Sequence, residues 1–131
     1  MTHTDLHKQL VRRLIDEVLN CGDLSALDEL CTPAMAAGAR GWIKPFLASF
    51  SDVRMEIVAL VAEEDTVVGR FRCSGTHTGA WGDREPTGRR FERIDEVYFF
   101  TLSGDRIAAA WGLEDTLTRQ QQLGLLARHA D

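Results

Sequence analysis

The chain changes its hydrophobic period once, close to residue 52, and this change limits the folds open to it. Before that point, apolar residues from Leu6 to Leu19 recur every third or fourth position, as on an amphipathic helix. After it, apolar and polar residues alternate over Val53–Ile57 and in later segments, as in strands with one buried face. Helices followed by a run of strands are typical of an α+β domain.

The first part predicts a helix that begins at a cap on Thr4 or Asp5 and ends at residues 20–23, Asn-Cys-Gly-Asp. Two shorter helices are expected at residues 24–30 and 42–50. Pro45 is compatible with the latter only in its first turn. The Ala- and Gly-rich residues 32–41 are ambiguous.

The second part predicts an antiparallel meander that is followed by a closing helix. The strands are expected at residues 52–62, 66–78, 89–102 and 106–113, and the helix at 116–128. Residues 79–88, with three glycines and a proline, form a long loop between two strands. We expect a strongly bent sheet with the helices closing its concave face. A sheet bent that far is not filled by average side chains, so an apolar pocket is expected inside.

The last hairpin allows a register prediction. A type I turn with a left-handed residue at 103–105 aligns odd residues with odd ones. Val97 and Phe99 then lie beside Trp111 and Leu113, and we expect this face to line the pocket. The other face is also apolar, which predicts a partner sheet in a homodimer, or in a tetramer. Its residues are Ile94, Tyr98, Phe100, Ala108 and Ala110.

Length, charge and hydropathy limit the kinds of partner that we expect. The 131 residues predict one domain, 1–131, and a net charge of −5 argues against a nucleic-acid surface. No apolar run approaches the roughly 18 residues of a membrane span, and the first residues do not resemble a signal peptide. We therefore expect a cytoplasmic protein whose partner is a small apolar molecule.

Cysteine and histidine spacing predicts no metal site. Cys21, Cys31 and Cys73 form no CxxC pair and are expected to be reduced. His3 and His7 share one helical face, but the sequence shows no third ligand nearby, so we expect them to be solvated.

Asp115 is the first catalytic candidate. It follows Trp111 and Leu113 in strand phase, which points it toward the pocket. A carboxylate at an apolar rim would have a raised pKa, which suits acid–base work. An Asp directly before Thr116 is also an ordinary helix N-cap, and spacing alone slightly favours the cap.

His77 is the second catalytic candidate. It shares a strand face with Phe71 and Cys73, and there it could donate to a substrate carbonyl and stabilise an enolate. Equally, it could hold the loop at 79–88 in place. Further candidates for substrate contact are Trp111, Phe71, Arg93, Thr101, Phe99, Trp42 and Trp81. Aromatic residues at strand spacing are more often core, but Trp81 lies in the Gly-rich loop and would cover the pocket or a neighbouring subunit.

No phosphate-binding glycine loop, nucleophile elbow or cysteine–histidine pair is present. The remaining possibilities are an enzyme that transfers protons on a small apolar molecule, or a protein without catalytic activity. Several segments in order resemble the SnoaL-like polyketide (ester) cyclases of the nuclear transport factor 2-like superfamily, over Leu6 to Leu125. They are Gly75–Gly79, Pro86–Arg90, Gly104–Ile107, Trp111 with Asp115, and Gln122–Gly124.

The resemblance implies a cofactor-free intramolecular aldol condensation in an α+β cone. In that family an aspartate near the end of the last strand takes a proton from carbon, and Asp115 matches its place, which favours catalysis over capping. His77 lies in the family's Gly-Thr-His stretch. Residues 32–41, where family members commonly carry His or Asn, have neither here, which predicts a smaller or drier pocket.

Two other functions remain open from the sequence. An epoxide hydrolase needs two carboxylates bridged by an arginine around a water molecule, and Arg93, Asp95 and Asp115 offer these residue types. Arg93 and Asp95 also suit a structural ion pair. A non-catalytic ligand-binding domain is the other alternative.

Overall fold

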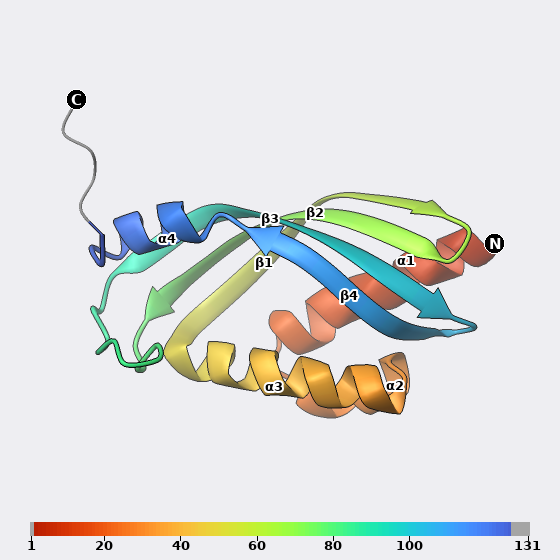
Figure 1. Cartoon of the computed structure of the whole chain (residues 1–131), viewed down its shortest axis with the longest axis horizontal. Helices are drawn as coiled ribbons and strands as arrows, with labels where there is room; N and C mark the ends of the chain where they lie inside the picture. Colours follow the sequence, from red (N-terminus) through yellow and green to blue (C-terminus); the bar gives the residue numbers. More distant parts are fainter. Residues whose placement is uncertain (1, 127–131) are drawn as a thin grey trace.

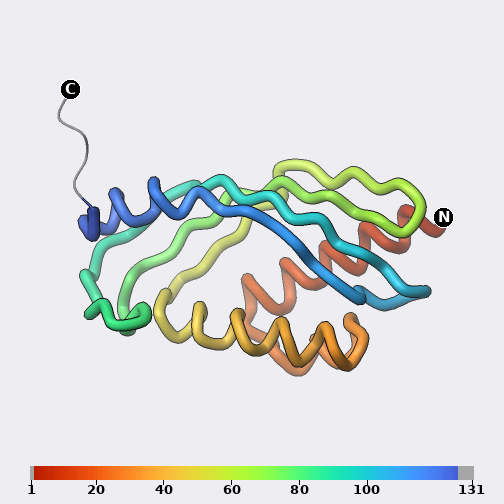
Figure 2. Tube along the Cα trace, in the orientation of Figure 1, coloured from red at the N-terminus to blue at the C-terminus, as the bar shows by residue number. Residues whose placement is uncertain are grey.

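A computed structural model describes residues 2–126 of the chain. Four antiparallel strands form one sheet in the order β1-β2-β3-β4; α1, α2 and α3 lie along one of its faces, and α4 lies at one end of the sheet (Figure 1). The sheet bends over α1 and α3, as the path of the chain in Figure 2 shows. The predicted α+β architecture is confirmed.

The first helix starts earlier than predicted. α1 (His3–Arg13) is capped by Thr2, whose hydroxyl accepts from the N–H of Asp5 while the Asp5 carboxylate accepts from the N–H of Thr2. The expected caps, Thr4 and Asp5, are therefore wrong, because Asp5 is instead the third helical residue of a capping box. The helix continues into η1 (Leu14–Leu19), a π-helical segment that ends with the bond from Asn20 N–H to the Ile15 carbonyl.

The region between α1 and the sheet is more helical than predicted. A short 3₁₀ turn, η2 (Leu24–Ala26), leads into α2 (Leu27–Leu30), as expected. α3 (Pro33–Ser49) then runs for 17 residues from a Thr32 cap. The prediction of a short helix at 42–50 is therefore wrong, because the helix begins nine residues earlier. Pro45 lies inside it rather than in its first turn, where it removes one backbone donor.

The strands lie close to their predicted positions: β1 (Phe50–Glu63), β2 (Thr66–His77), β3 (Arg90–Ser103) and β4 (Arg106–Glu114). The closing helix, α4 (Thr116–Gln122), begins where expected but ends at Gln122, so the predicted extension toward residue 128 is wrong for residues 123–126, while 127 and 128 lie outside the described residues. No helix in the described part is long and apolar enough to cross a bilayer.

The β3–β4 register is as predicted, but the faces are reversed. Val97 pairs with Leu113 and Phe99 with Trp111, odd with odd. This face points away from the helices, and Trp111 is 61% exposed. The even-numbered residues of β3 face the core because they pair with the buried side of β2: Phe71 lies opposite Glu96 and Val67 opposite Phe100.

The reversal corrects two predictions. Phe99, Trp111 and Leu113 do not line an internal pocket, and Ile94, Tyr98 and Phe100 do not form the outer face. Ile107 still points inward, because a register shift after Thr101 leaves one extra residue in β4 between its partners.

Candidate active site

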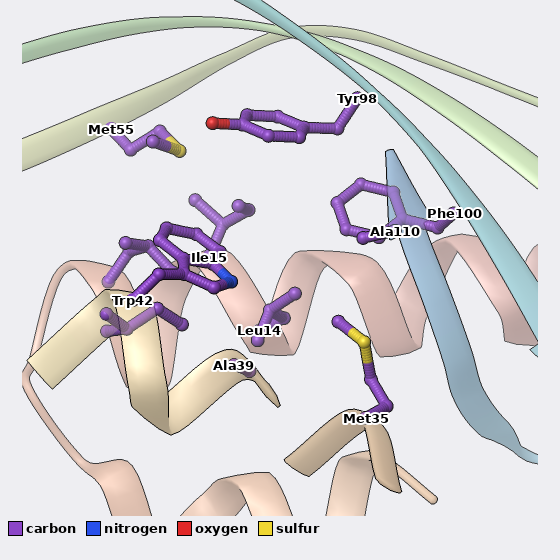
Figure 3. A pocket seen from close by; sticks show the side chains of 11 residues that line it. Leu14, Ile15, Met35, Ala39, Trp42, Met55, Tyr98, Phe100 and Ala110 are labelled. Carbon is purple, nitrogen blue, oxygen red and sulfur yellow. The ribbon is translucent and has the colours of Figure 1, made fainter. Parts of the chain in front are cut away.

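A small apolar cavity lies between the concave face of the sheet and the helices (Figure 3). Its volume is about 20 Å³, which is room for roughly one water molecule. Side chains from five elements line it, among them Leu14 and Ile15 of η1, Met35 and Trp42 of α3, Met55 of β1, Tyr98 and Phe100 of β3, and Ala110 of β4. The π-helical segment therefore forms part of the wall.

Trp42 and Tyr98 close one side of this cavity. Their rings stack with centroids 6.4 Å apart and planes 13° from parallel. Trp42 is 42% exposed, whereas Ile43, next to it in α3, is fully buried. The indole is thus the part of the wall that separates the Tyr98 ring from solvent.

The hydroxyl of Tyr98 contacts a group of charged side chains in which Glu96 and Arg119 are buried and Glu114 is partly exposed. Tyr98 Oη lies 3.1 Å from Oε1 of Glu96 and 2.9 Å from Oε2 of Glu114. Arg119 bridges the same two carboxyl groups from the other side. Its Nη2 donates to Glu96 Oε2 at 2.8 Å and its Nη1 donates to Glu114 Oε1. These four side chains, the Glu96 cluster, form a closed ring of polar contacts.

The pairing of β3 with β4 and the first turn of α4 bring the residues of the Glu96 cluster together. Glu96 and Glu114 are cross-strand partners on the concave face of β3 and β4. Arg119 lies one turn into α4 and is 1% exposed, with its guanidinium 4.7 Å from the Phe91 ring centroid and 5.7 Å from that of Phe46. A buried guanidinium requires paired charges, and the two carboxyl groups supply them.

The two contacts of the Tyr98 hydroxyl depend on the protonation of the carboxyl groups. A phenol has one proton, so Tyr98 donates to one carboxylate, and its second contact is a hydrogen bond only if the other carboxyl is protonated. Burial, aided by the charge of Glu114 and opposed by Arg119, raises the pKa of Glu96 to about 7. Burial and both carboxylates also raise the pKa of Tyr98 far above its ordinary value, so the phenol keeps its proton.

Asp115 lies outside the cavity. Its carboxylate accepts from the Thr118 N–H at 3.1 Å and from the Thr118 hydroxyl at 2.6 Å, which makes it the N-cap of α4. These hydrogen bonds lower its pKa, and the side chain is exposed. The expected raised pKa at an apolar rim is therefore wrong.

His77 is fully buried at the end of β2 and does not line the cavity. The Thr87 N–H donates to its Nδ1 at 3.2 Å, and the Gly88 N–H donates to its carbonyl. These bonds hold the loop at 79–88, as in the structural alternative. His77 Nε2 has no hydrogen-bond partner among residues 2–126.

Of the predicted substrate contacts, Trp42 alone lines the cavity. Phe71 is buried behind it, with its ring centroid 6.0 Å from that of Tyr98. Trp81 is half-buried in the loop and packs edge-on against Phe50. The remaining candidates are exposed elsewhere: Trp111, Phe99 and Thr101 on the helix-free face of the sheet, and Arg93 at a left-handed position of β3.

The proposed Arg93–Asp95–Asp115 constellation is not assembled. The Asp95 carboxylate pairs instead with Arg70 at 3.3 Å and Arg72 at 3.6 Å. Asp115 is occupied by Thr118, and it meets Asp95 only through a backbone hydrogen bond.

The family model of the SnoaL-like polyketide cyclases matches residues 9–123. The chain belongs to the SnoaL-like polyketide cyclase family. No curated protein sequence matches it closely.

Solved structures agree with this family. TsrD from Streptomyces laurentii is 26% identical with a TM-score of 0.83, and the match covers 93% of this chain and 97% of that one. IdmH from Streptomyces antibioticus, assigned as a polyketide cyclase, is 26% identical with a TM-score of 0.77 over 90% and 98% of the two chains. AclR from Streptomyces galilaeus, assigned as a hydroxylase, shares the fold at 22% identity with a TM-score of 0.85, over 97% and 86%.

The sequence patterns did not predict a site at Glu96, Tyr98, Glu114 and Arg119. One signal was available: Glu96 lies in strand phase with Ile94, Tyr98 and Phe100, so whichever side buries these residues also buries a carboxylate. A buried carboxylate needs a cation, and that need points to an arginine. Assigning this face to the outside of the sheet hid the signal.

Proposed function

We propose that this SnoaL-like chain is a cofactor-independent enzyme that transfers protons on a small apolar carbonyl compound, with Glu96 as base and Tyr98 as hydrogen-bond donor. The observation that carries the proposal is the double position of Tyr98. Its ring forms part of the wall of the apolar cavity, and its hydroxyl contacts the buried carboxyl group of Glu96 and the partly exposed one of Glu114. It therefore connects an apolar binding space to a proton reservoir.

The environment suits the two roles. With a pKa of about 7, Glu96 is partly ionised near neutral pH and is a stronger base than an ordinary carboxylate. Tyr98 stays protonated and can donate to the oxygen of an enolate as its charge develops. In an intramolecular aldol reaction, Glu96 takes a proton from carbon, the enolate carbon bonds to a second carbonyl, and the resulting alkoxide receives the proton.

The cavity predicts how a substrate enters. At about 20 Å³ it is too small for a polyketide-like molecule, so part of the wall must move. Trp42 is the exposed large side chain of the wall, and its indole lies nearly parallel to the Tyr98 ring. A planar unsaturated ligand that displaced the indole would keep a stacking contact with Tyr98 and reach its hydroxyl. This argument favours aromatic or polyketide-like carbonyl compounds.

The test compares Glu96 with Asp115, the acid that the family resemblance selects. Exchange of α-protons of aryl ketones and 1,3-diketones in D₂O is followed by NMR for wild type, Glu96→Gln, Tyr98→Phe and Asp115→Asn. A glutamine at 96 can accept from Arg119 and donate to Tyr98, so the ring of contacts is kept while the base is lost. Asn is a good N-cap, which makes Asp115→Asn the matched control.

We expect Glu96→Gln to lose exchange by at least about 100-fold, Tyr98→Phe by about 10-fold or more, and Asp115→Asn to match wild type. Wild-type exchange in Glu96→Gln, with loss in Asp115→Asn, would transfer the base to Asp115. If the ketones quench Trp42 fluorescence and yet no exchange occurs in wild type, the chain is a non-catalytic binding domain.

One observation favours epoxide hydrolysis as a second function. Arg119 bridges the carboxyl groups of Glu96 and Glu114, the residue types that such a site needs. One carboxylate would take a proton from water as the water oxygen bonds to an epoxide carbon, and the protonated carboxyl would give its proton to the epoxide oxygen. Incorporation of ¹⁸O from labelled water into a diol supports this function, and its absence for all epoxides offered excludes it.

A further inference from the structure

The start of α1 meets two hairpin turns at the end of the molecule opposite α4 (Figure 1). His3 and His7 come from successive turns of α1, and Asp65 comes from the turn between β1 and β2. One ligand atom from each of these three side chains lies within 4.8 Å of the other two. The sequence could not show this third group, because Asp65 is brought to the helix only by the fold.

A backbone oxygen lies between the two imidazoles. The Glu64 carbonyl oxygen is 3.2 Å from Nε2 of His3 and 3.2 Å from Nδ1 of His7. Two ligand atoms that share a tetrahedral zinc ion lie about 3.3 Å apart, given metal–ligand bonds of about 2.0–2.1 Å. The oxygen therefore already has the spacing of a neighbouring ligand to each nitrogen, and an Asp65 carboxylate oxygen lies within 4.8 Å of a ring nitrogen of each histidine.

His7 supplies an independent observation. Its side chain is 5% exposed, and its two ring nitrogens face different carbonyl oxygens, Nδ1 facing Glu64 and Nε2 facing Gly104 at 3.1 Å. Carbonyl oxygens only accept, and a neutral imidazole has a single N–H. When Nε2–H donates to Gly104, the Nδ1 lone pair points at the lone pairs of the Glu64 oxygen, which is unfavourable unless a positive charge lies between them.

We propose that His3, His7 and Asp65 bind a divalent transition-metal ion, with the Glu64 carbonyl oxygen completing the site. Zinc matches this set of nitrogen and oxygen donors in number and kind. The Nε2–H bond of His7 to the Gly104 carbonyl is the outer hydrogen bond that metal-bound histidines usually make, and it fixes Nδ1 as the ligand atom.

The ion would tie three segments together. α1 supplies both imidazoles, the β1–β2 turn supplies Glu64 and Asp65, and the β3–β4 turn holds His7 through Gly104. Binding would stabilise the folded chain, since the unfolded chain does not bring these groups together. The site is separate from the Glu96 cluster and does not depend on the function proposed for it.

The test uses the full chain after dialysis against a chelator. Zinc chloride is titrated by calorimetry, and thermal unfolding is recorded with and without one equivalent of zinc, with magnesium chloride as the control salt. His3→Ala and Asp65→Asn remove exposed ligands without opening the core, and Asp105→Asn is the matched control, an exposed acid in the neighbouring turn.

We expect one zinc ion per chain, a raised midpoint with zinc but not with magnesium, a loss of affinity of at least about 10-fold in His3→Ala and in Asp65→Asn, and no change in Asp105→Asn. Absence of zinc binding, or binding that both ligand variants leave unchanged, overturns the proposal.

A second experiment uses ¹⁵N NMR to determine whether each ring nitrogen of His7 is protonated or metal-bound. A metal-bound Nδ1 beside a protonated Nε2 in the zinc-loaded protein supports the site. Two protonated nitrogens that persist with excess zinc would show that a proton, and not a metal ion, lies between Nδ1 and Glu64, and would overturn it.

Discussion

Glu96 carries a carboxyl group on which burial, a second carboxylate, a guanidinium and a phenol all act. Burial and the charge of Glu114 favour its neutral form, while Arg119 and the Tyr98 hydroxyl favour its charged form. The first two dominate, so the folded chain retains a proton that the unfolded chain gives up at a lower pH. The same property that suits Glu96 to catalysis therefore makes stability depend on pH.

Replacing Glu96 by Gln should remove this dependence. The folded state binds more protons than the unfolded state between the ordinary pKa of 4.5 and about 7, so the wild-type free energy of unfolding should fall as pH rises through this window. The difference between wild type and Glu96→Gln should change by about 1–3 kcal/mol. Urea unfolding at several pH values between 4.5 and 7.5 measures it; parallel curves would contradict the raised pKa.

Asp115 is expected to act mainly on stability. Asp115→Ala removes the cap of α4 and should lower the free energy of unfolding by about 1 kcal/mol, while Asp115→Asn should lower it by much less. Chemical denaturation of the two variants tests this. A loss in Asp115→Asn as large as that in Asp115→Ala would mean that the charge, and not the cap, is what the helix needs.

At the scale of elements, turn length decided what the sequence could predict. The short turn at 103–105 fixes whether odd or even residues pair, and the β3–β4 register was predicted from it. The loop at 79–88 is long and fixes no parity, so the pairing of β2 with β3 could not be derived. Both faces of β3 are apolar, and assigning the face of Phe99 and Trp111 to the pocket put Tyr98 on the wrong side.

The same limit explains what was missed in the helices and at the site. Pro45 suggested a helix start, but α3 begins at Pro33 and continues past Pro45. Packing on the sheet outweighs the one backbone hydrogen bond that Pro45 removes. Arg119 lies in a helix whose sequence reads as surface, and only its distance to Glu96 and Glu114 shows why it is buried. Contacts across elements, unlike caps and turns, leave no local pattern.

Replacing a glycine by alanine should have opposite effects on stability at two positions, Gly112 of β4 and Gly41 of α3. A Cβ at Gly112 of β4 would overlap the Tyr98 ring and the Val97 carbonyl oxygen, so Gly112→Ala should destabilise the fold by about 1–3 kcal/mol and displace Tyr98. Gly41 of α3 has open space around its Cα, so Gly41→Ala should stabilise by about 0.5–1 kcal/mol. Thermal unfolding of both variants measures the two signs. Equal effects would contradict the close approach at Gly112.

For the molecule as a whole, the helix-free face of the sheet leaves large apolar side chains uncovered. Successive strand pairs align Val61, Val68, Phe99 and Trp111 in one row across all four strands. Leu113 follows Trp111 on the same face, and both are more than 60% exposed. Such a row on an open sheet face favours a second sheet packed against it. The face that we expect to mediate assembly is therefore the one with Phe99 and Trp111, and not the one with Tyr98 and Phe100. The reason for expecting assembly, an apolar sheet face exposed to solvent, is unchanged.

We propose that two copies pack through this row, and Trp111→Glu should separate them. A charge at the centre of an apolar sheet–sheet contact leaves a buried carboxylate without a partner, which should raise the dimer dissociation constant at least about 100-fold. Leu6→Glu is the matched control, because Leu6 is an exposed apolar residue, 49% accessible, on α1 at the opposite side of the sheet. Sedimentation velocity over a range of concentrations should show a dimer for wild type and Leu6→Glu and a monomer for Trp111→Glu. A wild-type monomer at all concentrations, or a dimer that Trp111→Glu leaves intact, would exclude this face as the interface.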